Sequence, residues 1–160
     1  MKLQKRGLLV SVLALFSAFP VAAQVEKVAM RTTGISCGLC AGLSELSFRR
    51  MPGVDRVAIS LSKEAIMLTY KQGASFDPEG IRKILARLQV GVTQFQISAK
   101  GHLEAEGERT LFIAGRNKFA IKELPHTAIP QGAPILIQGI LNDHANPMEL
   151  RILDFKPLGK

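Results

Sequence analysis

Aromatic residues and cysteines are scarce in this chain of 160 residues, which has no tryptophan, one tyrosine and two cysteines. Proteins that bind single-stranded nucleic acid use aromatic side chains that stack on bases, so the shortage argues against that class. A structural zinc site needs four protein ligands, which two cysteines cannot supply alone. Beyond its first two dozen residues the chain has no long apolar run, so we expect no membrane-spanning segment there.

Residues 1–23 have the pattern of a secretory signal. Three cations in the first six residues precede an apolar run over residues 7–19, and small residues follow at Val21-Ala22-Ala23. That run is short for a bilayer span, and the small residues stand where a signal peptidase cleaves. We therefore expect export to the periplasm and a mature chain that begins near Gln24. The alternative is an uncleaved membrane anchor.

The charge of the remaining chain is moderately basic. The whole sequence has 21 Lys and Arg against 13 Asp and Glu. Residues 1–23 hold three of the cations and none of the acids, so 18 cations face 13 acids in residues 24–160, a net charge of +5. These cations are scattered along the sequence, unlike the clustered basic stripe of a nucleic-acid-binding protein. We expect no nucleic-acid partner.

Residues 24–99 predict a ferredoxin-like α+β domain. Apolar residues alternate as in half-buried strands, or recur near a helical period, in six successive segments. Asp77 before Pro78 predicts a helix start, with an N-cap followed by proline at the first helical position. The segments are strand 26–35, helix 40–51, strands 55–62 and 64–71, helix 78–88 and strand 92–99. The order βαββαβ is that of the split βαβ fold, which packs two helices on one face of a four-stranded antiparallel sheet.

Residues 100–160 predict a second, all-β domain. Short apolar runs alternate with glycine and proline, and the predicted strands are 102–105, 110–114, 118–122, 134–141 and 149–155. Five short strands favour a small closed or nearly closed barrel, because closure removes bare sheet edges. The pattern broadly resembles oligonucleotide/oligosaccharide-binding folds, without a diagnostic motif. No flexible linker separates the domains at Lys100-Gly101, so the last strand of the first domain is expected to continue into the second.

Cys37 and Cys40 carry the clearest chemical signal in the chain. They stand three residues apart at the junction between a predicted strand and a predicted helix. A helix N-terminus lowers the pKa of a nearby thiol, and the thiolate is the form that binds metals. The sequence places Cys40 at the helix start, so we expect the pKa of Cys40 to be below that of a free thiol. Paired thiolates select Cu(I) and comparable soft ions.

The surrounding motif resembles that of the heavy-metal-associated domain family. Residues 34–40 (GISCGLC) are similar to the family's Gly-Met-Thr-Cys-x-x-Cys loop, and the Pro52-Gly53-Val54 turn is similar to its Pro-Gly-Val. The resemblance covers about residues 26–99. It implies that Cys37 and Cys40 are the two ligands of Cu(I) or Hg(II), and that Ile35 replaces the family's methionine as an apolar plug beneath the loop. Family members include copper chaperones, soluble domains of copper-pumping ATPases and the periplasmic mercuric-ion binding protein.

The resemblance therefore implies an exported, non-enzymatic, monomeric protein that carries or sequesters a soft metal and meets a membrane metal transporter or a metallochaperone. Two other roles of the cysteine pair stay open: a thiol–disulfide oxidoreductase, which uses the same spacing, and a disulfide that only staples the loop. His102, His126 and His144 do not pair at ligand spacing and are expected to be surface residues. Residues 24–99 should fold and bind metal alone, unless the barrel shares their core.

Overall fold

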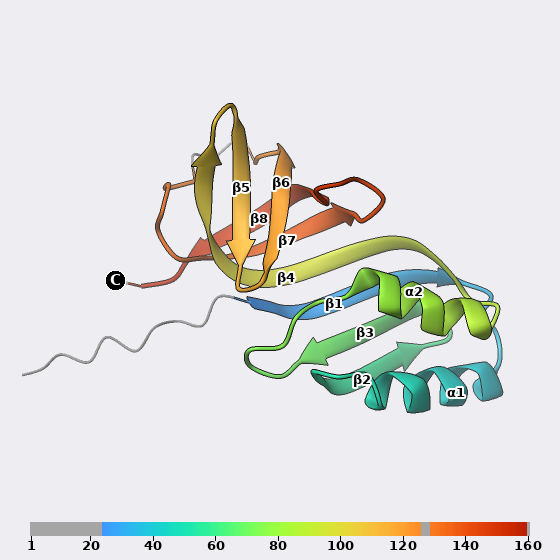
Figure 1. The fold of residues 1–160 in the computed structure, drawn as a ribbon. Helices are drawn as coiled ribbons and strands as arrows, with labels where there is room; N and C mark the ends of the chain where they lie inside the picture. Colours follow the sequence, from blue (N-terminus) through green and yellow to red (C-terminus); the bar gives the residue numbers. More distant parts are fainter. Residues whose placement is uncertain (1–23, 126–128, 160) are drawn as a thin grey trace, which may run out of the picture.

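The computed structural model describes residues 24–125 and 129–159. The predicted signal, residues 1–23, and His126 lie outside these ranges. The described chain contains two helices and eight strands (Figure 1). Their bounds are β1 Gln24–Thr33, α1 Gly38–Arg49, β2 Val54–Ser60, β3 Ala65–Tyr70, α2 Pro78–Arg87, β4 Gly91–Glu106, β5 Arg109–Ala114, β6 Asn117–Glu123, β7 Ile135–Asn142 and β8 Glu149–Pro157. In these ranges neither helix is long and apolar enough to cross a bilayer.

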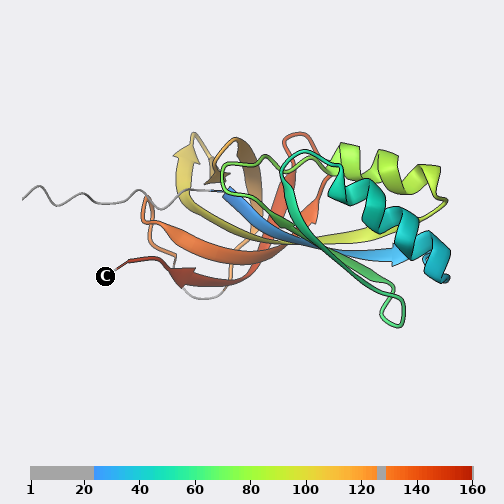
Figure 2. The same ribbon diagram turned by 90° about the horizontal axis from the view of Figure 1, so that it is seen from below.

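The first six elements confirm the predicted βαββαβ order. Strands β2, β3, β1 and β4 lie side by side in that order and pair antiparallel throughout. Both helices lie on the same side of this sheet (Figure 2). Helix α2 begins as the sequence predicts: Pro78 is its first residue, and the Asp77 carboxylate caps it by accepting a hydrogen bond from the Gly80 N–H at 2.9 Å.

Strand β4 joins the first unit to the second. It runs for 16 residues, from Gly91 to Glu106, and the predicted boundary between residues 99 and 100 falls inside it. Its first part pairs with β1 on one side, residues 95–101 pair with β7 on the other, and residues 102–106 pair with β5. The pairing of β4 passes from β7 to β5 after Gly101, where a Cβ would lie 2.0 Å from the Ile113 carbonyl oxygen. Only glycine leaves room for this close approach of two backbones.

The second unit is a closed five-stranded barrel, as the sequence predicts. The hydrogen-bonded order is β4-β5-β6-β8-β7, and the pairing of β7 with β4 completes the circle. All neighbours are antiparallel except β6 and β8, which run parallel. The segment between β6 and β7 carries no strand in its described residues.

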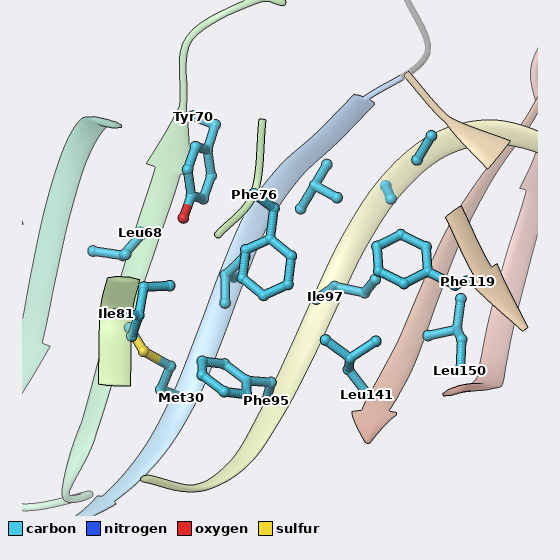
Figure 3. Close-up of a cluster of buried hydrophobic side chains, with 14 of the residues drawn as sticks. Met30, Leu68, Tyr70, Phe76, Ile81, Phe95, Ile97, Phe119, Leu141 and Leu150 are labelled. Carbon is cyan, nitrogen blue, oxygen red and sulfur yellow. The ribbon is translucent and has the colours of Figure 1, made fainter. Parts of the chain in front are cut away.

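One hydrophobic cluster runs through both units (Figure 3). Phe95 and Ile97 of β4 are fully buried or nearly so, and they lie between side chains of the first unit and Phe119 and Leu150 of the barrel. Two polar links between the units reinforce the joint. The predicted units therefore share both a strand and a core.

The first link is the ion pair between Arg82 of α2 and Asp143, in the loop between β7 and β8. The Arg82 guanidinium donates two hydrogen bonds to the Asp143 carboxylate, at 2.5 and 2.8 Å, and stacks 5.1 Å above the Phe95 ring. The second link joins Asn117 to the backbone of Phe76. The Asn117 amide accepts from the Phe76 N–H at 3.1 Å and donates to the Phe76 carbonyl at 3.0 Å.

Candidate metal centre

The loop that carries Cys37 follows directly from the end of β1. Gly34 has φ +87°, a conformation that side chains disfavour, and a Cβ there would lie 3.0 Å from the Gln89 carbonyl oxygen. Ile35 is fully buried, which confirms the predicted apolar plug beneath the loop. Cys37 then takes an extended backbone conformation and α1 starts at Gly38. The chain is thus turned and anchored immediately before the first cysteine.

Cys37 is the N-cap of α1, and Cys40 lies in the first helical turn. The Cys40 N–H donates a hydrogen bond to the Cys37 Sγ at 3.1 Å. Both thiols are free; Cys37 is exposed, and Cys40 is half-buried against the core. The structure therefore brings the two predicted ligands together at the open end of a helix. The prediction that the helix starts at Cys40 is wrong by two residues, because Cys37 can cap the helix itself.

The helix start decides which thiol is the more acidic. The hydrogen bond from the Cys40 side chain and then that from the Cys40 backbone N–H lower the pKa of Cys37 below its ordinary value. The same side-chain hydrogen bond, with burial and the nearby Cys37 charge, raises the pKa of Cys40. The expectation that the pKa of Cys40 would be lowered is therefore wrong. As the pH rises, Cys37 loses its proton first and Cys40 keeps its proton longer.

No further metal ligand surrounds the cysteines in the described residues. Within residues 24–125 and 129–159, no three His, Cys, Asp or Glu side chains come close enough together to hold a metal ion. His102 lies in β4 and His144 in the loop after β7, so neither joins the pair. The geometry offers two sulfur donors at an exposed end of the molecule.

Helix α1 presents an unexpected apolar surface beside the cysteines. Leu43 and Leu46 recur near a helical period in the sequence, but they are 43% and 49% exposed, while Ser44 and Phe48 are fully buried. Leu39, between the two cysteines, is 73% exposed. Residues 39, 43 and 46 follow the helical spacing i, i+4, i+7, so they form one stripe opposite the buried face. The spacing could have revealed a second apolar face, but not which face points inward.

No family model and no curated protein sequence matches the chain. Among solved structures it is similar to the CopZ metallochaperone, with 16% identity and a TM-score of 0.39 over 42% of this chain and 98% of that one. It is also similar to the yeast copper transporter domain Ccc2a, solved in apo and Cu(I)-loaded states (20% identity, TM-score 0.38, 42% and 94% of the two chains). A third match is the N-terminal soluble domains of Bacillus subtilis CopA, with 26% identity and a TM-score of 0.38 over 53% of this chain and 54% of that one.

These matches are heavy-metal-associated domains, the family that the motif around Cys37 and Cys40 resembles. The likeness predicted from the sequence is thus confirmed as a likeness. Since the TM-scores stay below 0.5, it establishes neither membership of the family nor a shared function.

Proposed function

We propose that this protein binds one soft metal ion, Cu(I), between the thiolates of Cys37 and Cys40, and that it carries or sequesters this ion without catalysing a reaction. The observation that carries the proposal is the pair of free thiols at the open N-terminus of α1, with the Cys40 N–H hydrogen-bonded to the Cys37 sulfur. Hg(II) has the same preference for two thiolates and is the alternative ion.

The donor set favours a soft, low-coordinate ion over zinc. Zinc in structural sites takes four protein ligands, and the described residues supply two sulfurs and no neighbouring imidazole or carboxylate. Cys37 loses its proton more easily than Cys40 when the metal binds, because the pKa of Cys37 is lowered and that of Cys40 is raised. Binding then removes the proton that Cys40 holds, so metal affinity should increase with pH over the range in which Cys40 titrates.

The surroundings of the cysteines support transfer of the ion to another protein. Cys37 and Leu39 are exposed, and the leucine stripe of α1 continues from the cysteines along the helix. An exposed apolar surface of this kind marks a contact with a partner. The proposal therefore includes a membrane metal transporter or a metallochaperone as the partner of a monomeric, exported protein that works in the periplasm.

The pKa difference within the pair also favours a second candidate function, thiol–disulfide exchange. An exposed thiol of lowered pKa followed by a less acidic one is the arrangement in which the first cysteine attacks and the second resolves the mixed disulfide. The two functions predict different behaviour, since exchange requires turnover with a disulfide substrate whereas metal carriage requires tight binding of one ion.

The proposal assigns the barrel to the oligonucleotide/oligosaccharide-binding fold type. Numbered within the barrel, its strands follow the order 1-2-3-5-4 and close back to strand 1, with strands 3 and 5 parallel. This supports the fold type alone, because a fold of this kind hosts many functions.

Metal titration of residues 24–160 tests the main proposal. The protein is purified anaerobically with reductant and titrated with Cu(I) against a competing chelator. We expect one ion per chain, and we expect Cys37→Ser or Cys40→Ser to weaken binding by orders of magnitude. Ser36→Ala, which leaves both thiols in place, is the matched control. Unchanged affinity in the double cysteine variant refutes metal binding by the pair, and catalytic reduction of insulin disulfides would favour the exchange function instead.

A further inference from the structure

The sheet has a second face, which the helices leave open. Helix α1 packs over β2 and helix α2 over β4, both on the same side (Figure 2). On the other side, side chains of β2, β3, β1, β4 and β7 form three shallow hollows of about 180, 520 and 240 Å³. The third hollow shares Ala29 and Gln96 with the first, and Lys27 and Met67 with the second. The hollows are therefore parts of one trough that crosses from the first unit to the barrel strand β7.

Strand register shows how this trough is built. Ala58, Met67, Ala29 and Gln96 face one another across β2, β3, β1 and β4, and they form its floor. Alanine is uncommon in strands, where branched side chains normally fill the surface. The short side chains of Ala58 and Ala29, on either side of Met67, therefore leave a depression in the surface of the sheet. Met67 is 43% exposed at the centre, and methionine is a side chain that adapts to varied apolar partners.

The rims of the trough are positively charged. Lys27 and Arg56 stand in the neighbouring row on one side, and Arg31 stands on the other. One acidic residue, Asp55, lines the hollows, and it pairs with Arg56 at 3.6 Å on the exposed surface. Lys27 and Arg31 form no ion pair with the described residues. The trough thus has two unpaired cations on opposite rims of a small, partly apolar floor.

Amide side chains complete the surface toward the barrel. Gln94, Gln96 and Gln138 line the hollows on β4 and β7. Each glutamine amide both donates and accepts hydrogen bonds, which matches the N–H and C=O groups of a peptide backbone. No aromatic ring lines the hollows, so they offer no stacking platform for bases. These features favour a peptide over a nucleic acid as the occupant.

We propose that this open face docks an extended acidic segment of a partner protein, whose carboxylates reach Lys27 and Arg31 while an apolar side chain rests on Met67. Neighbouring strands are about 4.8 Å apart, so the crossing of five strands is about 19 Å long, which fits about six extended residues. The docking surface lies on the sheet face away from the helices and is independent of the proposed metal site.

Fluorescence anisotropy with a defined peptide tests the docking surface. The probe is a short labelled peptide with the repeat Asp-Asp-Val, in which neighbouring Asp side chains point to opposite sides of an extended chain and so can face both rims. The same peptide with every Asp replaced by Asn is its neutral counterpart. We expect the acidic peptide to bind residues 24–160 and the neutral one to bind much more weakly. Lys27→Glu combined with Arg31→Glu should weaken binding about tenfold or more, since two charge contacts are reversed. Met67→Ser should weaken it without a change of charge.

The matched control places the same charge change elsewhere. Arg87 at the end of α2 and Lys118 in β6 are exposed and form no ion pair with the described residues. Their double substitution by Glu should leave the affinity within about twofold. An equal loss in both variants, or equal binding of the neutral peptide, refutes the proposal. Tighter binding of single-stranded DNA than of the acidic peptide, lost in the Lys27/Arg31 variant, would show a polyanion site instead. Cu(I) binding should be unchanged throughout, which separates this test from that of the metal site.

Discussion

Replacing Phe119 with alanine in the barrel tests whether the two halves of the chain unfold together. Phe119 is fully buried in β6 and belongs to the cluster that includes Phe95 and Ile97 (Figure 3). Truncation of a buried phenylalanine to alanine typically costs about 3–5 kcal/mol, through lost burial and the cavity that remains. If the core is one cooperative unit, the first half must lose the same stability as the barrel.

The chain supplies a local probe for this experiment. The chain has one tyrosine, Tyr70, and no tryptophan. Tyr70 lies buried at the end of β3, in the first half of the chain. Tyrosine fluorescence during urea unfolding therefore reports on the first half, whereas far-UV circular dichroism reports on the whole chain. With an m-value of about 2 kcal/mol per molar urea, Phe119→Ala should lower both midpoints by about 2 M.

Leu153→Ala changes an exposed leucine of β8 and should shift the midpoint only slightly, because exposed substitutions change stability by about 0.5 kcal/mol or less. If Phe119→Ala shifts the circular dichroism signal but leaves the Tyr70 transition in place, the halves unfold separately, and the shared-core reasoning fails.

Three further outcomes are expected. Burial alone would raise the pKa of Asp143, but the hydrogen bond and charge of Arg82 hold this pKa below its usual value. The ion pair therefore stabilises the folded chain at pH values above the unfolded-state pKa of Asp143. This contribution is lost as the pH falls through the folded-state pKa. Asp143→Asn should therefore cost about 2 kcal/mol at neutral pH in urea unfolding, and the difference from wild type should vanish in acid. Iodoacetamide should alkylate Cys37 before Cys40 at a pH below the ordinary thiol pKa, as peptide mapping would reveal; preferential modification of Cys40 contradicts the assignment of the acidic thiol. A chain ending at Lys100 should be unfolded or aggregated by circular dichroism and gel filtration, and a folded fragment with a cooperative transition would contradict this.

Local sequence patterns predict most elements of this fold because their causes are local. The strands show alternation, and the α2 start at Asp77-Pro78 follows from capping chemistry between neighbours. The motif around Cys37 and Cys40 indicates the candidate site for the same reason. Its acid–base order was not predictable, since it depends on whether the helix begins at residue 38 or 40. A difference of that size is within the uncertainty of helix ends read from sequence.

What the sequence did not reveal depends on distant partners. The periodicity of α1 contains two apolar faces, and only packing against the sheet decides that Ser44 and Phe48 point inward while the leucines point outward. The contacts of Arg82 with Asp143 and of Asn117 with Phe76 join residues 61 and 41 positions apart. Each of these residues alone has an ordinary polar side chain, so no local pattern marks the pair.

The barrel solves a problem that the ferredoxin-like sheet has at its edge. In the order β2-β3-β1-β4, strand β4 would be an edge strand with free N–H and C=O groups beside buried apolar side chains. Strand β7 pairs with residues 95–101 and occupies that edge. The same strand β4 starts at Gly91, just after Gln89, whose carbonyl oxygen lies against Gly34 at the base of the cysteine loop. Because β7 pairs with β4 from residue 95 onward, the barrel anchors the strand whose first residues follow the support of the cysteine loop.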